Sequence, residues 1–357
     1  MTPIKIIYDT DPGVDDAMAL YFALAHPGLD VVGITTTFGN VTVEQAAANA
    51  LYLSALAGYA HIPVAKGVAA PLVKPSEAPP DFIHGRDGLG NQPIRHAVPS
   101  RALDPRSGAQ FIVDMARAHP GEITLVAVGP LGNVCAALRL EPTLPQLLRE
   151  VVIMGGTVAE PGNVSPVAEA NIWNDPHAAE QVFAAGFQLT MVGLDVTHRV
   201  VTELSLFDAM ARHHQHPAID TLRHAVAFYA DFYTGVHASI QRKGCFAHDL
   251  LAFVYVVAPQ LFETERGVVR VAVDGIANGQ TMMNRRAHIQ YPQMGWAEGR
   301  PATTVCMRVD APACLALFEA TMMDKAWLKP VVGQVDSVGV ASRQDAAVAP
   351  PHRHSSV

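Results

Sequence analysis

Short apolar segments alternate with longer amphipathic segments along most of the chain. The apolar segments are rich in β-branched residues, and we predict strands at Lys5–Tyr8, Val31–Thr36, Ile123–Val128, Val151–Met154 and Gln188–Val192. The amphipathic segments predict helices at Val14–His26, Val43–Ala57, Leu131–Leu140 and His177–Ala185. Continuously apolar strands are typical of a parallel sheet that helices cover on both faces. The alternation therefore predicts a single-domain α/β fold with an open, mostly parallel, doubly wound sheet.

The rest of the chain is less regular. Residues 200–260 predict mainly helix, strands return at Val268–Val273 and Thr304–Val309, and a last helix covers about Pro312–Asp324. The segment Lys66–Ser107 is rich in proline and glycine, and a loop of this length in a compact domain is usually functional or mobile. Residues 331–357 have no apolar period, so we predict a domain over residues 1–330 followed by a disordered tail.

Composition excludes several classes of protein. Of 357 residues, 50% are hydrophobic and only 16% are charged, which excludes a disordered chain. The net charge of −8 and the lack of a basic run argue against a nucleic-acid partner. No segment reaches the roughly 18 apolar residues of a membrane span. The start of the sequence lacks the apolar region of a signal peptide, and four cysteines without CxxC spacing suggest reduced thiols, so we predict a cytoplasmic protein.

Polar residues and glycines follow four of the predicted strands. They form the segments Asp9–Asp16, Thr37–Asn40, Gly129–Asn133 and Gly155–Gly156. In an open parallel sheet, ligands bind beyond the carboxyl ends of the strands. We therefore expect these four segments to form one site.

The sharpest signal is a group of four carboxylates, Asp9, Asp11, Asp15 and Asp16. Two carboxylates about 4 Å apart repel by about 4 kcal/mol at an effective dielectric constant of about 20, and a hard cation relieves this repulsion. A site made only of oxygen atoms suits Ca²⁺ or Mg²⁺ better than zinc. The alternative is that acidic residues at a helix N-terminus only complement the helix dipole. That alternative explains Asp15 and Asp16 but not Asp9 and Asp11, which precede the predicted helix.

Two further segments carry candidate binding residues. His248 and Asp249 open the apolar run Leu250–Ala258, where Asp249 could instead be a helix N-cap. Asn163, Glu169 and Asn171 offer paired donors and acceptors that suit a polyhydroxylated ligand, although such a loop is otherwise simply solvated.

With these residues in view, the chain resembles the nucleoside hydrolases, the inosine/uridine-preferring nucleoside N-ribohydrolase family, from about Lys5 to about Asp324. The resemblance rests on an ordered set of motifs: DTDPGVDDAMAL, TTFGN, IHG, VAVGPLGN, VVIMGG, GNVSPVAEAN followed by NDP, and the late HD pair. It implies hydrolysis of the N-glycosidic bond of ribonucleosides to ribose and free base, a role in purine or pyrimidine salvage, and Ca²⁺ as cofactor. It also implies a homotetramer or homodimer whose partner is a small ribonucleoside, not a membrane.

The resemblance assigns roles to individual residues. The calcium ligands are Asp11, Asp16, Asp249 and the backbone carbonyl of Gly132. The substrate-binding residues are Asp15, Asn40, His84, Met154, Asn163, Glu169 and Asn171. Asp11 corresponds to the base that deprotonates a Ca²⁺-bound water, and the transition state is oxocarbenium-like. His248 corresponds to a residue near the leaving base, and we predict that it is the acid that protonates this base, with His84, Tyr229, Tyr233 and solvent as alternatives.

The sequence departs from the family pattern in three places, of which one is the segment Asn278–Trp296. Gly132 stands where the family usually has threonine, and Ala170 stands where it usually has an aromatic residue. Trp173 lies two residues beyond Asn171, and we predict that it is a core residue. Two other functions fit parts of the pattern. Asp9-x-Asp11 after a strand is also found in aspartate-nucleophile phosphatases, and a catalytically weak nucleoside- or calcium-binding protein could share the scaffold.

Overall fold

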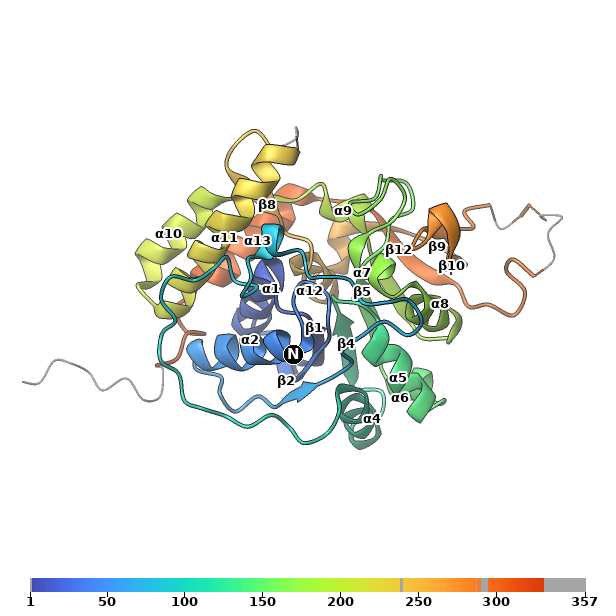
Figure 1. Cartoon of the computed structure of the whole chain (residues 1–357), viewed down its shortest axis with the longest axis horizontal. Coiled ribbons are helices and arrows are strands. Elements are labelled where there is room, and N and C mark those ends of the chain that lie inside the picture. The colour runs from blue at the N-terminus through green and yellow to red at the C-terminus, as the bar shows by residue number, and fades with distance from the viewer. Residues whose placement is uncertain (1, 238–239, 287, 290–294, 331–357) are drawn as a thin grey trace, which may run out of the picture.

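A central eight-stranded sheet organises the molecule (Figure 1), and the computed structural model describes residues 2–237, 240–286, 288–289 and 295–330. The strand order is β3-β2-β1-β4-β5-β6-β12-β9, and each neighbouring pair is parallel except β12 with β9. The strands are β1 (Ile4–Thr10), β2 (Leu29–Thr36), β3 (Val64–Lys66), β4 (Ile123–Ala127), β5 (Glu150–Met154), β6 (Leu189–Val192), β9 (Phe262–Gly267) and β12 (Thr303–Val309). The predicted α/β fold with an open, mostly parallel sheet is confirmed.

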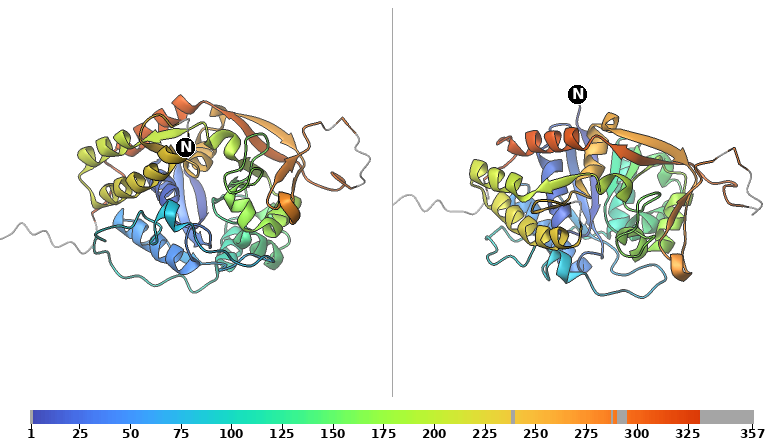
Figure 2. Two further views of the ribbon diagram at one scale, coloured as in Figure 1. Left: turned by 45° about the horizontal axis from the view of Figure 1, so that its top comes forward. Right: turned by 90° about the horizontal axis from the view of Figure 1, so that it is seen from above.

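Helices cover both faces of this sheet (Figures 1 and 2). One face carries α1 (Val14–Ala25), α2 (Val43–Leu56), α10 (Leu204–His214), α11 (Pro217–Val236), α12 (Leu250–Val257) and α13 (Ala311–Met323). The other face carries α4 (Gly108–Ala118), α5 (Gly132–Leu140) and α8 (Pro176–Ala184). Side chains of a strand point alternately to its two faces. Accordingly, Ile6 and Tyr8 of β1 enter the first core and Ile7 enters the second.

Short elements connect these layers. They are α3 (Asp81–His84), α6 (Leu144–Leu147), α7 (Ala170–Asn174), α9 (Leu194–Thr197), η1 (Pro259–Leu261) and η2 (Gly275–Ala277). Two small antiparallel sheets pair β7 (Val201–Glu203) with β8 (Gly244–Phe246) and β10 (Val269–Val271) with β11 (Thr281–Met283). No helix in the described ranges is both long and apolar enough to cross a membrane.

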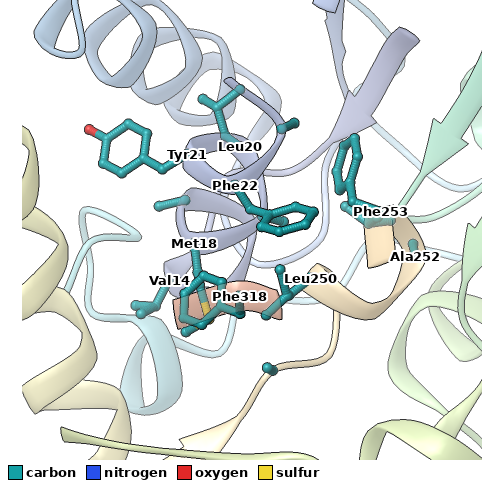
Figure 3. Close-up of a cluster of buried hydrophobic side chains, with 14 of the residues drawn as sticks. Val14, Met18, Leu20, Tyr21, Phe22, Leu250, Ala252, Phe253 and Phe318 are labelled. Carbon is teal, nitrogen blue, oxygen red and sulfur yellow. The ribbon is translucent and has the colours of Figure 1, made fainter. Parts of the chain in front are cut away.

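The packing of α1 on α12 matters most for the site (Figure 3). Met18 and Phe22 of α1 lie in one fully buried cluster with Phe253 of α12 and Phe318 of α13. The Phe22 and Phe318 ring centroids are 6.2 Å apart. Fully burying a side chain of this size stabilises a protein by about 1.5–3 kcal/mol. Because the acidic turn precedes α1 and Asp249 precedes α12, this apolar contact brings carboxylates from distant parts of the sequence together.

The structure corrects the element prediction in several places. The edge strand after α12 is β9, which ends at Gly267, whereas we predicted a strand over Val268–Val273; only Val269–Val271 is a strand, and it belongs to a small separate sheet. The sequence FETERG of β9 has four consecutive polar residues between Phe262 and Gly267, and so lacks the continuous apolar run that marked the other strands. Sequence analysis also missed β3 and α4. The predicted disordered tail, residues 331–357, lies outside the described residues.

Candidate active site

The carboxyl ends of the strands open into a cavity of about 910 Å³. Its lining includes most of the predicted site residues, namely Asp15, Asn40, His84, Met154, Asn163, Glu169, Asn171, His248 and Asp249. Asp11 and Asp16 are fully buried beside them, in the turn between β1 and α1. Two of the four strand-end segments, the turn after β1 and the loop after β2, therefore meet at this cavity as expected.

Asp16 organises the turn between β1 and α1. Its carboxylate accepts hydrogen bonds from the backbone N–H groups of Gly13 at 2.9 Å and Asp11 at 3.2 Å. It also accepts from the Thr10 hydroxyl and from Asn40 Nδ2, the latter at 2.9 Å. The bond from Gly13 is a capping interaction, so the helix-terminus interpretation is correct for part of what Asp16 does. The remaining bonds fix the orientation of the whole acidic turn.

Asp11 lies between two loops that approach its carboxylate closely, and only glycine leaves room for the carboxylate at the points of approach. Its Oδ2 accepts a 2.6 Å hydrogen bond from the backbone N–H of Asn40. A Cβ atom at Gly39 would lie 2.1 Å from Oδ2, and one at Gly129 would lie 2.6 Å from Oδ1. The glycines of the TTFGN and GPLGN motifs thus let two loops close around one carboxylate.

Three carboxylates form the most compact acidic group in the described part of the chain. One oxygen each of Asp15, Asp16 and Asp249 lies within 4.8 Å of the others. Burial first, and neighbouring carboxylates second, raise the pKa of Asp15 to about 8 and that of Asp249 well above its usual range. Asp249 occupies the N-cap position of α12, but its side chain makes no capping hydrogen bond there. The predicted group contained Asp11 in place of Asp15, and the assignment of metal ligands among these residues stays a prediction.

This carboxylate group fits a divalent cation. Asp11 Oδ1 and Asp15 Oδ1 are buried, and neither makes a hydrogen bond within the described residues. A buried, unpaired carboxylate oxygen is costly unless a charge compensates it. All the side-chain donors are oxygen atoms, which suits Ca²⁺ or Mg²⁺.

Gly132 was predicted as the one ligand that binds through its backbone carbonyl. It occupies the first turn of α5, where an added Cβ would lie 2.6 Å from Val68 Cγ2 and 3.5 Å from Asp175 Oδ2. Gly132 is not among the residues that line the cavity. Its proposed role as a carbonyl ligand stays a prediction from the family resemblance.

Glu169 is positioned by backbone groups. It is the N-cap of α7, and its carboxylate accepts hydrogen bonds from the backbone N–H groups of Asn171 at 2.8 Å and Ile172 at 3.1 Å. It also accepts the N–H of Gly156 at 2.8 Å, which joins the loop after β5 to this helix. Burial raises the pKa of Glu169 despite these hydrogen bonds. The side chain therefore combines a capping role with a place in the cavity wall.

Asn171 spans the ends of two neighbouring strands. Its Nδ2 donates to the carbonyl oxygen of Val128 at 2.6 Å and to that of Met154 at 3.1 Å. These bonds use both amide hydrogens and leave Oδ1 as the polar atom for a ligand. Asn163 is exposed at the rim, where its Oδ1 accepts the N–H of Ala170 at 3.0 Å.

His248 lies within a chain of hydroxyl groups. Its Nδ1 is 2.8 Å from Thr197 Oγ1, and its Nε2 is 3.1 Å from Tyr233 Oη. Tyr229 Oη in turn donates to Tyr233 Oη at 3.4 Å. Burial, and then the charges of neighbouring histidines, lower the pKa of His248 well below its usual value. His248 is therefore neutral near pH 7, and both ring nitrogens face hydroxyl groups, which the simple prediction of a histidine acid did not include.

His84 is a second neutral histidine at the cavity. We ranked it below His248 because it lies in a long irregular segment, but the structure places it in α3 with only 5% of its surface exposed. Its Nδ1 accepts the backbone N–H of Val14 at 3.2 Å, so the ring proton is on Nε2. Burial lowers the pKa of His84 to about 3, so the 3.9 Å approach to Asp15 is not an ion pair near pH 7.

Several cavity residues were missed or misplaced by sequence analysis. Trp173 lines the cavity and is half-buried, so our prediction of a core residue is wrong. Tyr229 and Tyr233 were named only as alternatives, and His237 was not named as a site residue. These three residues recur every fourth position along α11 and just beyond it, which places them on one face of the helix. That spacing was the available signal.

Known proteins resemble this chain along nearly its whole length. The sequence matches the family model of the inosine-uridine preferring nucleoside hydrolases over residues 6–316. A probable uridine nucleosidase 2 of Arabidopsis thaliana is 38% identical over 322 residues, which cover 90% of this chain and 98% of that protein. The inosine-uridine preferring nucleoside hydrolase of Leishmania major is 37% identical over 286 residues, 80% of this chain and 88% of that protein.

Solved structures agree. A plant nucleoside hydrolase superposes with a TM-score of 0.84 at 36% identity, covering 90% of this chain and 99% of that one. A purine-preferring ribonucleoside hydrolase from Gardnerella vaginalis gives a TM-score of 0.81 at 32% identity, covering 91% of this chain and 100% of that one. Sequence, fold and strand-end acidic site lead to one conclusion: the chain belongs to the inosine-uridine preferring nucleoside hydrolase family and is a ribonucleoside hydrolase.

Proposed function

We propose that Asp11, Asp16 and Asp249 hold a Ca²⁺ ion at the floor of the cavity and that Asp15 binds the ribose. The observation that carries this proposal is that Asp11 Oδ1 and Asp15 Oδ1 are buried and make no hydrogen bond within the described residues; Asp9 Oδ2 is the third such aspartate oxygen. Asp15 lines the cavity, whereas Asp11 and Asp16 lie beneath its surface. The greater depth of Asp11 and Asp16 supports a metal role for them, and Asp249 lines the cavity as Asp15 does.

The residues of the chain divide the chemistry among them. A divalent cation here would supply charge neutralisation and would make a nearby water molecule more acidic. Asp11 accepts the proton that this water loses. Asn40, Glu169 and Asn171 orient the ribose through amide and carboxylate oxygens. The acidic surroundings stabilise the positive charge that develops on the sugar ring as the glycosidic bond breaks.

We also propose that the departing base receives its proton through Tyr229 and Tyr233. Hydroxyl groups at 3.4 Å and an imidazole at 3.1 Å form a continuous path from the cavity to Thr197. A neutral His248 cannot store an extra proton, but it can accept one on one nitrogen while releasing one from the other. His84, with its proton on Nε2, is the second candidate donor.

The phosphatase alternative has no support in the geometry. Asp9 is fully buried, and its Oδ1 accepts hydrogen bonds from the Thr35 hydroxyl and from Asn133 Nδ2 at 2.7 Å. It is not among the residues that line the cavity. Asp9 therefore has a structural role, in which its carboxylate links β1 to Thr35 of β2 and to Asn133 of α5.

The names of relatives suggest the first substrates to test, because they include uridine nucleosidases, inosine-uridine preferring hydrolases and a purine-preferring hydrolase. We propose uridine and inosine as substrates. The expectations of a homotetramer or homodimer, a salvage role and a cytoplasmic location stay predictions from the sequence.

The test is release of reducing sugar from uridine and inosine, with 2′-deoxyuridine as the matched control substrate. We expect release from the ribonucleosides to stop with a chelator and to return when Ca²⁺ is added. Turnover that a chelator leaves unchanged after exhaustive dialysis would overturn the metal proposal while leaving the hydrolase activity intact.

A further inference from the structure

We propose that Lys74 is a positioning residue that holds one wall of the cavity in place and thereby sets the affinity for the nucleoside without touching it. The wall is residues 68–84, which we call the strap. The inference rests on the ribonucleoside hydrolase activity of the chain, but not on the identity of the metal or of the proton donor.

The strap crosses from one side of the site to the other. It leaves β3 at the lower edge of the sheet, passes α7 and α8, and ends in α3 in front of α1 (Figures 1 and 2). Its residues 76–84 contribute to the cavity lining. At its start, the Val68 N–H donates to Asn133 Oδ1 at 2.9 Å, and the Leu72 N–H donates to Asp175 Oδ2 at 3.0 Å. At its end, His84 accepts the N–H of Val14.

The middle of the strap has little to hold itself in place. Pro75, Pro79 and Pro80 have no N–H to donate, and residues 69–80 form no helix or strand. Among the contacts of the described residues, the bond from Leu72 to Asp175 is the last that anchors the main chain of the strap to another element before α3. A side-chain anchor at position 74 therefore determines where the wall of the cavity lies.

Lys74 makes three contacts at this point. Its ammonium lies 3.4 Å from the centroid of the Trp173 ring and 3.3 Å from the Trp173 carbonyl oxygen. It also lies 3.3 Å from Glu77 of the strap itself, and its side chain is only 16% exposed. A cation over an indole face contributes about 0.5–2 kcal/mol, with the higher values in partly desolvated sites. The carbonyl near the end of α7 gains a charged donor at the same time.

Trp173 links this anchor to the site. Its ring lines the cavity, and its backbone belongs to α7, the helix that Glu169 caps and that carries Asn171. A Cβ atom at Gly279 would lie 2.7 Å from Trp173 Cα, so the helix is also held from behind. Lys74 therefore fixes the strap to α7, and α7 is itself held in place relative to the proposed ribose-binding residues.

The consequence is a change in substrate affinity rather than in chemistry. If Lys74 is replaced, the strap must be ordered when the nucleoside binds, and that cost reduces binding. Once the substrate is bound, the reacting groups are in their usual places. A mutation that raises KM and leaves kcat unchanged has removed an interaction of this kind.

The experiment compares Lys74→Met, Lys74→Arg and Lys329→Met in the full-length enzyme. Methionine keeps the apolar stem and removes the charge, whereas arginine keeps a cation that stacks on an indole. Lys329 is the matched control, because its ammonium lies 4.1 Å from the centroid of the Tyr59 ring and neither residue lines the cavity. KM and kcat are measured for uridine and inosine, and hydrogen exchange is followed in residues 68–84.

We expect Lys74→Met to raise KM about 3- to 30-fold for both substrates, the range that a cation–π contact supports, with kcat within about 2-fold of wild type. Lys74→Arg should restore most of the affinity, Lys329→Met should leave KM unchanged, and only Lys74→Met should speed exchange in the strap. Wild-type KM in Lys74→Met, or equal losses in Lys74→Met and Lys329→Met, would overturn the proposal. A fall in kcat at unchanged KM would do the same, because Lys74 would then act on the chemistry. Absence of turnover in the wild-type enzyme would instead count against the hydrolase activity, and the exchange measurement would still test the anchor.

Discussion

Tyr233→Phe tests whether the leaving base is protonated through the hydroxyl chain. The substitution removes one oxygen, which lies 3.1 Å from His248 Nε2 and 3.4 Å from Tyr229 Oη. The ring stays in place, since it packs edge-on against Tyr229 and Phe246 at centroid distances of 4.8 Å and 5.2 Å. General acid catalysis typically contributes about 10²- to 10⁴-fold, so we expect a loss of kcat in that range for inosine. Uridine should lose less, because uracil leaves more readily as an anion.

The order of the groups along this hydrogen-bonded path leads to a sharper prediction for the double variant. His248 Nε2 contacts Tyr233, so the imidazole acts through that hydroxyl. His248→Ala alone should also slow inosine cleavage, and Tyr233→Phe combined with His248→Ala should be no more than about 2-fold slower than Tyr233→Phe alone. Residues that act as one unit show such non-additive effects.

The assay is kcat for inosine and uridine in the wild type, both single variants and the double variant. Thermal unfolding is measured in parallel, because His248 is only 4% exposed and its truncation leaves a cavity. Tyr255→Phe is the control, since its hydroxyl also bonds a neighbour, Thr190, but lies outside the cavity lining. Additive losses in the double variant would refute the single path. Unchanged inosine turnover in Tyr233→Phe would transfer the donor role to His84.

Two further predictions concern carboxylates. Asp11→Asn should nearly abolish turnover and weaken Ca²⁺ binding, as measured by calorimetry. Asp15→Ala should retain Ca²⁺ and raise KM. Equal loss of Ca²⁺ in both variants would show that the two residues share their roles. Asp87 should stabilise the protein in a pH-dependent way. Burial alone would raise its pKa, but three backbone N–H groups between residues 89 and 92 and the Arg95 guanidinium lower it below the usual value. A depressed folded-state pKa gives stability that is present above about pH 4 and is lost as the pH falls further. Denaturant titrations should therefore show that Asp87→Asn lowers the unfolding free energy near pH 7 and has a smaller effect near pH 3, and an equal effect at both pH values would contradict this.

Sequence alone was sufficient to predict the strands that are buried on both faces, because such strands are continuously apolar. The strands that became β1, β2, β4, β5 and β6 are covered on both faces, so their apolar runs predicted them directly. The edge strand β3 is short and the edge strand β9 is mostly polar, and sequence analysis missed the first and misplaced the second. The same logic applies to the site. Because parallel strands place their carboxyl ends at one edge, the sequence predicted that the acidic turn and the glycine loops would meet.

Tertiary structure decided which atoms lie together within that region. Packing of α1 against α12 brings the oxygens of Asp249 within 4.8 Å of those of Asp15 and Asp16. It also brings Asp15 into this compact group together with the adjacent Asp16, although adjacent residues on a helix point in different directions. Likewise, α11 brings the Tyr233 hydroxyl and α9 brings the Thr197 hydroxyl to the two ring nitrogens of His248. The strap brings the Lys74 ammonium over the Trp173 ring. These contacts join segments far apart in the chain, and no local periodicity encodes them.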